Sequence, residues 1–178
     1  MTRWRAGRPL SLTEPVDPDD VGGAERMAGR LLAASDRSRS EVERRLRARG
    51  YSQATATRAV ERLAERGWID DGRVAENLSR RRLERGYGRR RIIAELVARG
   101  IPPETVSEAA QQVGEDQTEL ALLTARRLLA GAPRPLPAPD LRRVAGALQR
   151  RGFTARDIHA ALRQLTALTA TGEGDALE

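Results

Sequence analysis

From Ala24 onward, apolar residues recur at intervals of three and four along nearly the whole chain, which is the spacing of amphipathic helices. Residues that favour helix starts stand between these apolar stretches. Ser38 and Glu41 have the spacing of a capping box, and Ser52 opens the stretch that follows. Glycines stand where such helices would end. The pattern predicts an all-α protein.

The helical pattern also repeats along the chain. Three six-residue segments align without gaps, and their glycines lie 50 and 52 residues apart. The segments are LRARGY (Leu46–Tyr51), LVARGI (Leu96–Ile101) and LQRRGF (Leu148–Phe153). Further apolar positions match on both sides of these segments. The matched sets are Val42, Ile92 and Val144; Ala56, Val106 and Ile158; Ala59, Ala109 and Ala161; Val60, Ala110 and Leu162; and Leu63, Val113 and Leu165. Three tandem repeats of three helices each are therefore predicted.

The three aligned glycines, Gly50, Gly100 and Gly152, are predicted to end the second helix of each repeat in a left-handed conformation. The large apolar residue after each glycine is expected to pack back between the second and third helices. The third helices are expected to open at Ser52, at Pro103, and at Thr154 with Asp157.

Five parts are assigned along the chain. Residues 1–23 are expected to form a disordered tail, residues 24–67, 68–113 and 114–169 the three repeats, and residues 170–178 an acidic tail. Because repeats of this length bury little surface alone, neighbouring repeats are expected to share contacts in an elongated, curved array.

The third repeat has the longest internal connection. Its first helix is expected from Glu115 to about Ala130, and the Pro-rich segment 131–139 is expected to be a stiff linker before Asp140 caps the next helix. Residues available for the inner face of that first helix are Leu120, Leu123, Ala125 and Leu128.

Charge and composition point to an anionic partner. The net charge is +7, both ends of the chain are acidic, and all 32 basic residues are arginine. A GC-rich coding bias accounts for the missing lysine, but each positive charge is still a planar fork suited to phosphate and carboxylate. The absence of cysteine excludes disulfides and thiolate metal sites. No apolar run of membrane-spanning length or signal peptide is evident, so a cytoplasmic protein without membrane contact is expected.

Little in the sequence indicates catalysis. His159 is the only histidine, and Asp70 with Asp71 fits a helix N-terminus better than a metal site. Neither a phosphate-binding loop nor a nucleophile elbow is present. We therefore expect no enzymatic activity, no catalytic residue, no metal and no cofactor.

Two arginine clusters are candidate binding surfaces. The main patch flanks the Gly86–Gly88 break, and its arginines outnumber the acidic residues near them. The second patch is the weaker candidate, because acidic residues lie close to its arginines. Base stacking is not favoured, since Tyr87 is the only aromatic residue in the main patch. The alternative is that these arginines form a solvated helix face, and Arg82 is also placed to extend from the edge of the core. The main patch is Arg80, Arg81, Arg82, Arg85, Arg89, Arg90 and Arg91; the second patch is Arg44, Arg45, Arg47 and Arg49.

The segment Gly67–Ile101, GWIDDGRVAENLSRRRLERGYGRRRIIAELVARGI, resembles the signature of the RecX family, regulators of the RecA recombinase. The preceding SEVERRLRARGY and the triple helical repeat also resemble that family, from about Ala24 to Leu168. Val74 and Trp68 differ from the Phe and Tyr that are usual there.

The resemblance implies a non-enzymatic inhibitor that binds in the groove of the RecA nucleoprotein filament. It would restrain filament extension, ATP hydrolysis, strand exchange and co-protease activity, and so act in homologous recombination, DNA repair and the SOS response. The arginine patches are the expected contacts, and the protein is expected to be a monomer. The competing hypothesis is a general helical module that binds single- or double-stranded DNA. A third is a scaffold for an unrelated acidic protein, and an enzyme is the least favoured.

Overall fold

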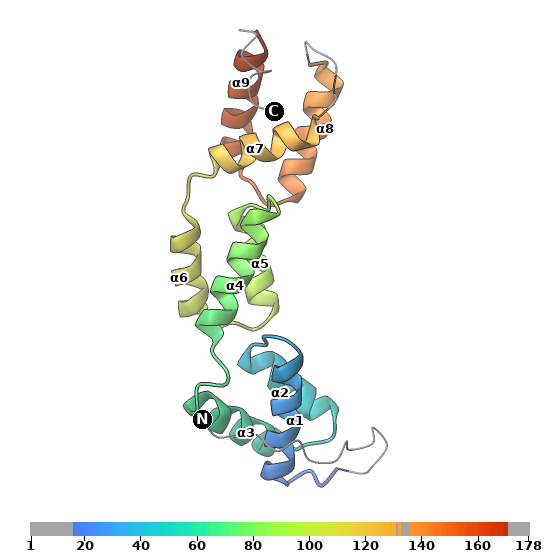
Figure 1. Cartoon of the computed structure of the whole chain (residues 1–178), viewed down its shortest axis with the longest axis vertical. Coiled ribbons are helices and arrows are strands. Elements are labelled where there is room, and N and C mark those ends of the chain that lie inside the picture. The colour runs from blue at the N-terminus through green and yellow to red at the C-terminus, as the bar shows by residue number, and fades with distance from the viewer. Residues whose placement is uncertain (1–15, 131, 133–135, 171–178) are drawn as a thin grey trace. The chain divides into compact units, whose positions relative to one another are not determined.

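The computed structural model describes residues 16–130, 132 and 136–170, and every regular element among them is an α-helix (Figure 1). This confirms the predicted all-α class. The chain divides into two compact units, one ending at Ile69 and one beginning at Asp70. The first unit contains α1 (Val21–Ala34), α2 (Arg39–Ala48) and α3 (Gln53–Glu65). The second contains α4 (Asp71–Glu84), α5 (Arg89–Ala98), α6 (Pro103–Val113), α7 (Thr118–Leu128), α8 (Ala138–Arg150) and α9 (Ala155–Ala170).

Polar side chains begin the helices at the expected positions. The Ser38 hydroxyl accepts the backbone N–H of Glu41 at 3.1 Å, and the Glu41 carboxylate accepts the N–H of Ser38 at 3.0 Å, which confirms the capping box. Asp70 accepts a backbone N–H in the first turn of α4. Asp157 accepts the N–H of Thr154 at 3.1 Å and its hydroxyl at 2.6 Å. Each such cap stabilises its helix by about 1 kcal/mol.

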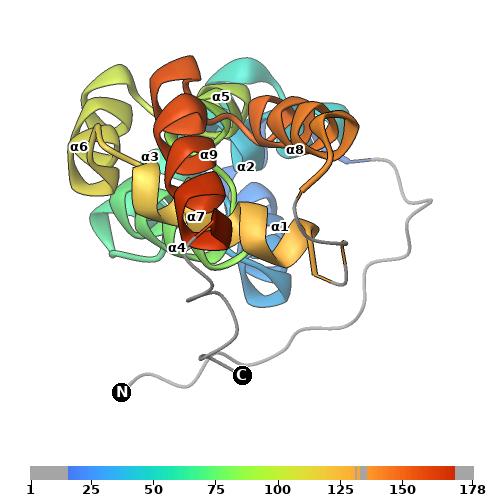
Figure 2. The same cartoon turned by 90° about the horizontal axis from the view of Figure 1, so that it is seen from above.

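The buried side chains of the described residues form three clusters, one for each repeat. The matched positions of the middle helices lie at their centres. Each of these six side chains is at most 2% exposed: Val42, Leu46, Ile92, Leu96, Val144 and Leu148. Helix α7 crosses α9 within the third cluster (Figure 2). The predicted helical repeat is thus confirmed in its core positions.

The turns after the middle helices also follow the prediction. Gly50, Gly100 and Gly152 have φ values of 111°, 68° and 91°, in the left-handed region that side chains disfavour. The residue after each glycine is buried, with exposed fractions of 6%, 5% and 2% for Tyr51, Ile101 and Phe153. Each therefore packs back onto its own repeat.

The first helix begins earlier than expected. Residues 1–15 lie outside the described residues, but 16–23 are ordered against the first unit rather than part of a tail. Asp20 accepts the N–H of Gly23 at 2.8 Å and starts α1 at Val21, while Val16 packs on the first core. The two glycines that look like a break are the first turn of a capped helix. At the other end of this unit, Ile69 also joins the first core, two residues beyond the expected boundary.

The third repeat differs most from its predicted boundaries. Helix α7 covers Thr118–Leu128 rather than 115–130, and Ala121, Leu122 and Ala125 face the core, whereas Leu123 and Leu128 are exposed. The expected inner face is therefore wrong for those two leucines.

Helix α8 begins at Ala138, inside the expected linker, because the fixed φ of proline suits a first helical turn. Pro137 is the N-cap, and Asp140 lies in the first turn, where it pairs with Arg143 at 3.2 Å. The expected cap at Asp140 is wrong. Of segment 131–139, residues 131 and 133–135 lie outside the described residues, as do residues 171–178 of the predicted acidic tail.

Within the second unit, the second and third repeats meet through their main chains. The Gly88 N–H donates to the carbonyl of Arg151 at 2.8 Å, and the Arg90 N–H donates to that of Gly152 at 3.2 Å. A Cβ at Gly88 would lie 2.6 Å from the Gly152 oxygen, and one at Gly152 would lie 2.4 Å from the Arg91 nitrogen. The approach therefore requires glycine on both sides. We call this contact the glycine joint.

Gln117 supports the glycine joint from the side. Its amide oxygen accepts the N–H of Arg89 at 2.9 Å, and its amide nitrogen donates to Val113 at 3.1 Å. Its own backbone N–H donates to the buried carboxylate of Asp157 at 3.3 Å. One residue, 6% exposed, thus connects the start of α5, the end of α6 and the start of α9.

Gly88→Ala is expected to loosen the joint. Since φ at Gly88 is −84°, alanine fits the backbone, and the cost arises from overpacking against Gly152, about 1–3 kcal/mol of unfolding free energy. Amide hydrogen exchange at Arg90 should become faster. Gly67→Ala is the control. An alanine there is strained by the φ of +72° but meets no neighbouring atom, so exchange at Arg90 should stay unchanged. Unaltered protection of Arg90 in Gly88→Ala would contradict the joint.

Candidate interaction surface

The seven arginines of the main patch occupy the end of α4 and the start of α5, on either side of the Gly86–Gly88 turn. Arginine at the C-terminal end of α4 is favoured by the helix dipole. Arginine in the first turn of α5 is disfavoured by the same effect, and Gly88 supplies no side-chain cap there. The start of α5 is therefore a place where a carboxylate or another anion is stabilising.

Glu95 is the carboxylate that meets this cluster. Its two oxygens accept Nε–H of Arg82 at 2.6 Å and Nε–H of Arg91 at 3.0 Å. Partial burial alone would raise the pKa of Glu95, but the hydrogen bonds and charges of the two arginines outweigh burial and hold that pKa below its usual value. Arg82 thus connects α4 to α5, whereas Arg91 pairs with Glu95 within α5.

Two guanidinium groups approach the ring of Tyr87. The Arg82 guanidinium carbon is 5.4 Å from the centre of the Tyr87 ring, and that of Arg151 is 5.3 Å away. Arg151 also donates to the carbonyls of Arg85, at 3.0 Å, and Gly86, at 3.5 Å. These carbonyls end α4, so Arg151 of the third repeat caps a helix of the second. The ring contributes to the joint, and both guanidiniums approach it.

Arg89 also has a structural role. It is half-buried, and its Nε–H donates to the carbonyl of Ala110 near the end of α6 at 3.0 Å. Three of the seven predicted contact residues, Arg82, Arg89 and Arg91, are therefore engaged inside the second unit.

The other four side chains are exposed. Arg80 donates to the amide oxygen of Asn77 on its own helix at 2.6 Å. Arg81, Arg85 and Arg90 form no side-chain ion pair with any described residue. These three are the main-patch arginines best able to bind an external anion.

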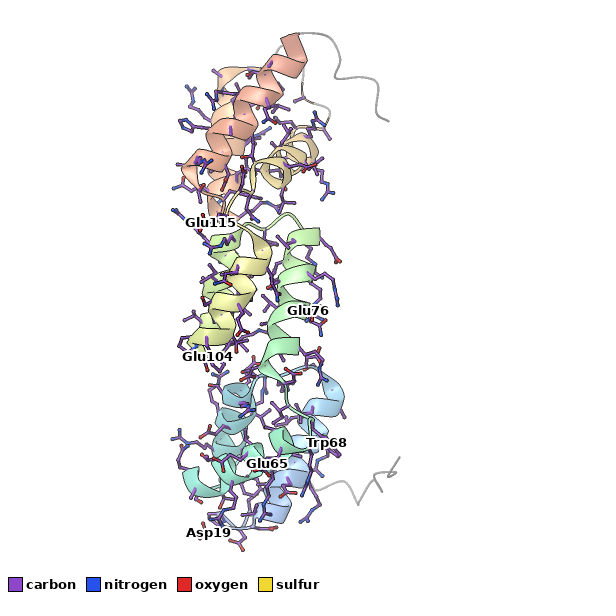
Figure 3. All side chains as sticks on the ribbon, turned by 90° about the vertical axis from the view of Figure 1, so that its left-hand side faces the viewer. Asp19, Glu65, Trp68, Glu76, Glu104 and Glu115 are labelled. Carbon is purple, nitrogen blue, oxygen red and sulfur yellow. The ribbon has the colours of Figure 1, made fainter. Side chains whose placement is uncertain are left out.

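Acidic side chains are also exposed on the second unit. Figure 3 shows Glu76 of α4, Glu104 of α6 and Glu115 before α7 directed outward on the face that carries α6. Since Glu76 is one helical turn before Arg80, that arginine has an acidic neighbour. The positive character of the patch is thus greatest nearer the Gly86–Gly88 turn.

The second patch lies on α2 in the first unit. Arg44, Arg45 and Arg47 are exposed, and Arg49 is half-buried. The sequence did not reveal Arg151, although a signal was present: Arg49, Arg99 and Arg151 all stand immediately before the aligned glycines. An arginine at an equivalent position in every repeat indicates a role in the repeat itself.

Comparison with known proteins identifies the family. Family models described as the first and second three-helix domains of RecX match residues 24–63 and 70–109. The chain is 41% identical over 133 residues to regulatory protein RecX of Xanthomonas campestris pv. campestris, covering 75% of this chain and 82% of the relative. For the protein of the same name from Stenotrophomonas maltophilia, the identity is 39%, covering 75% and 81%. The chain belongs to the RecX family.

Solved RecX structures share the fold. The crystal structure of RecX from Lactobacillus salivarius superposes with a TM-score of 0.71 at 21% identity, covering 84% of this chain and 98% of that chain. A second crystal structure of regulatory protein RecX gives 0.69 at 21% identity, covering 80% and 73%. The two matched RecX domains contain both arginine patches, the second patch in residues 24–63 and the main patch in residues 70–109. The patches therefore lie in the parts by which the family is recognised.

The described residues of this RecX-family chain contain no group of three His, Asp or Glu side chains arranged to hold a metal ion. His159 is exposed on α9. Among the helices described, none combines the length and the apolar character that a membrane span requires. The chemistry that the surface does offer is recognition of anions by arginine.

Glu95→Gln is expected to reveal the ion pair that joins α4 to α5, together with the pair to Arg91 within α5. Because the folded-state pKa of Glu95 is depressed, its stabilising effect is present above its ordinary pKa of 4.5 and disappears as pH falls through the lower folded-state value. The difference in unfolding free energy between wild type and Glu95→Gln, from urea titrations, should thus shrink from pH 7 to pH 3.5. Glu108→Gln, at an exposed position in the middle of α6 without an ion pair to a described residue, should give no comparable trend. A difference for Glu95→Gln that is constant with pH would contradict the assignment.

Proposed function

We propose that this chain is a non-enzymatic inhibitor of the RecA recombinase that binds in the groove of the RecA–DNA filament and restrains its extension. ATP hydrolysis, strand exchange and co-protease activity fall as a consequence, so the protein limits recombination, DNA repair and the SOS response. The observation that carries this proposal is membership of the RecX family, at 41% identity over 133 residues to a regulatory protein RecX.

The surface supports a contact made by arginine. Arg81, Arg85 and Arg90 are exposed near one turn, and the exposed arginines of α2 add a second basic surface. Guanidinium forks bind both carboxylates and phosphates in pairs of hydrogen bonds, so a filament of protein and DNA offers them two kinds of partner. The proposed contacts of the main patch are these three residues rather than all seven.

The glycine joint supports inhibition by a preorganised surface. It holds the start of α5 against the third repeat, so the exposed arginines are presented by a supported part of the second unit. A supported surface loses less conformational entropy when it binds than a mobile one does.

The competing function is a general DNA-binding module without a protein partner. Binding to DNA alone through several phosphate contacts weakens steeply as salt increases, whereas docking on a protein filament requires RecA. RecA ATPase on single-stranded DNA, titrated with this protein at physiological salt, separates the two when DNA binding is measured in parallel. Inhibition at protein concentrations well below that of RecA, without coating of the DNA, supports the proposal. Inhibition only when the DNA is coated favours the general module.

Arg81→Glu combined with Arg90→Glu is expected to abolish inhibition of the RecA ATPase. Both side chains are exposed and neither forms an ion pair with a described residue, so helix content by circular dichroism should remain that of wild type. Arg58→Glu with Arg163→Glu makes the same change in net charge at exposed positions of α3 and α9, and should inhibit as wild type does. Full inhibition by the first pair would refute the main-patch assignment.

A further inference from the structure

Helix α5 presents an apolar strip to solvent, next to the main patch. Ile92 and Leu96 face the core of the second repeat. On the outward side of the same helix, Ala94, Val97 and Ala98 are exposed. Val97 is 60% exposed, more than any other large hydrophobic side chain among the described residues. We call Ala94, Val97 and Ala98 the α5 strip.

The corresponding positions of the other two repeats carry polar side chains. The three positions lie six, three and two residues before the aligned glycine of each repeat. They hold Arg44, Arg47 and Ala48 in α2, and Gly146, Gln149 and Arg150 in α8. Arginine and glutamine are therefore compatible with the repeat at these outward positions, and only the second repeat has no polar side chain at any of them. The fold does not require a valine there.

Leu123 shows the ordinary case of an exposed apolar residue. It is 41% exposed on α7, but Glu119 and Arg127 stand one turn away on either side, so it is isolated on a charged surface. Scattered residues of this kind are normal on soluble proteins. On α5, by contrast, the two alanines of the strip adjoin Val97, and half-buried Ile93 lies one turn before it. The apolar surface of α5 is therefore continuous.

Arg90 stands at the amino-terminal end of the α5 strip. It is four residues before Ala94 and seven before Val97, so the three side chains follow one face of the helix. Its side chain is exposed and forms no ion pair with a described residue. A partner that covers the strip therefore meets a positive charge at one end, and an acidic group is the complement to it.

We propose that the α5 strip contacts the protein of the filament, RecA, rather than its DNA. This inference rests on the proposed function and names which component of the filament this part of the chain binds. The surface that fits has an apolar side chain over Val97 and a carboxylate within reach of Arg90, about 10 Å further along the helix at 1.5 Å per residue.

The chemistry of the strip distinguishes the two components of the filament. Protein contacts bury apolar side chains at their centre and keep charges at the rim, which is the arrangement of Val97 and Arg90. Contacts to a DNA backbone consist of positive charge and hydrogen-bond donors, and a valine supplies neither. The combination of an apolar strip and one terminal arginine therefore favours an acidic and apolar protein surface over phosphate.

The test uses Val97→Gln, which changes no charge. The full chain is mixed with RecA filaments formed on single-stranded DNA with a slowly hydrolysed ATP analogue, and the bound fraction is measured after sedimentation. Affinity should fall about ten-fold, because the valine is no longer buried. The melting temperature should stay the same or rise, since glutamine favours helix more than valine and Gln149 is exposed at the aligned position. A lower melting temperature would show that the chain itself covers Val97 and would overturn the proposal.

Two matched variants control for the substitution. Leu123→Gln makes the same kind of change at the isolated exposed leucine of α7, and Val97→Ile keeps an apolar β-branched side chain on the strip. Both should bind filaments as wild type does. Binding of each variant to a bare single-stranded oligonucleotide, followed by fluorescence anisotropy, should equal that of wild type. An equal loss of affinity for bare DNA and for filaments in Val97→Gln would assign the strip to DNA and overturn the proposal.

Salt distinguishes the strip from the arginine at its end. The ratio of wild-type affinity to that of Val97→Gln should be the same at low and high salt, because apolar burial is not screened. The corresponding ratio for Arg90→Gln should shrink as salt increases, because a charge contact is screened. An effect of Val97→Gln that disappears at high salt would contradict an apolar contact.

The wild-type chain tests the proposed function separately in the same experiment. Failure of the wild-type chain to bind RecA filaments would refute the proposed function, and the role of the strip with it. Binding by wild type together with equal binding by Val97→Gln would refute the role of the strip alone.

Discussion

The second unit depends on the contact between two main chains at Gly88 and Gly152. Because neither residue has a side chain, the start of α5 approaches closely enough for the N–H groups of Gly88 and Arg90 to donate to the carbonyls that follow α8. Other contacts across the joint follow from this approach. Arg151 reaches the carbonyls that end α4, and Gln117 reaches the N–H of Arg89. The second and third repeats thus form one unit although each has its own apolar core.

Arginine serves both the interior and the surface of this protein. The guanidinium of Arg82 reaches Glu95 and the ring of Tyr87, and in the first unit Arg62 and Arg66 share the carboxylate of Glu25. A group with five N–H donors can bridge two helices and still carry its charge at the surface. In a chain whose 32 basic residues are all arginine, a basic cluster in the sequence therefore contains structural members as well as exposed arginines without an internal partner.

The sequence predicted the helices, the repeat and the core because these depend on local spacing. The capping box at Ser38 and the positive φ at Gly152 are examples, each decided within a few residues. The sequence-based predictions were wrong or incomplete where contacts between residues far apart in the chain determine the structure. The inner face of α7 is set by packing against α9, which exposes Leu123. The structural role of Arg89 was missed because its partners, Ala110 and Gln117, lie more than twenty residues away.

Comparison among the repeats distinguishes glycines that the fold needs from those that it does not. Gly88 aligns with Ser38, so the second repeat lacks the side-chain cap that the first repeat has at this position. The reason lies within the chain, since any Cβ at Gly88 would collide with Gly152. Gly146 aligns with Ala94, and the third repeat loses helix propensity there without any such collision. A glycine whose loss of helix propensity has a steric cause within the chain is therefore part of the fold, as at Gly88, whereas alanine is expected to be tolerated at Gly146.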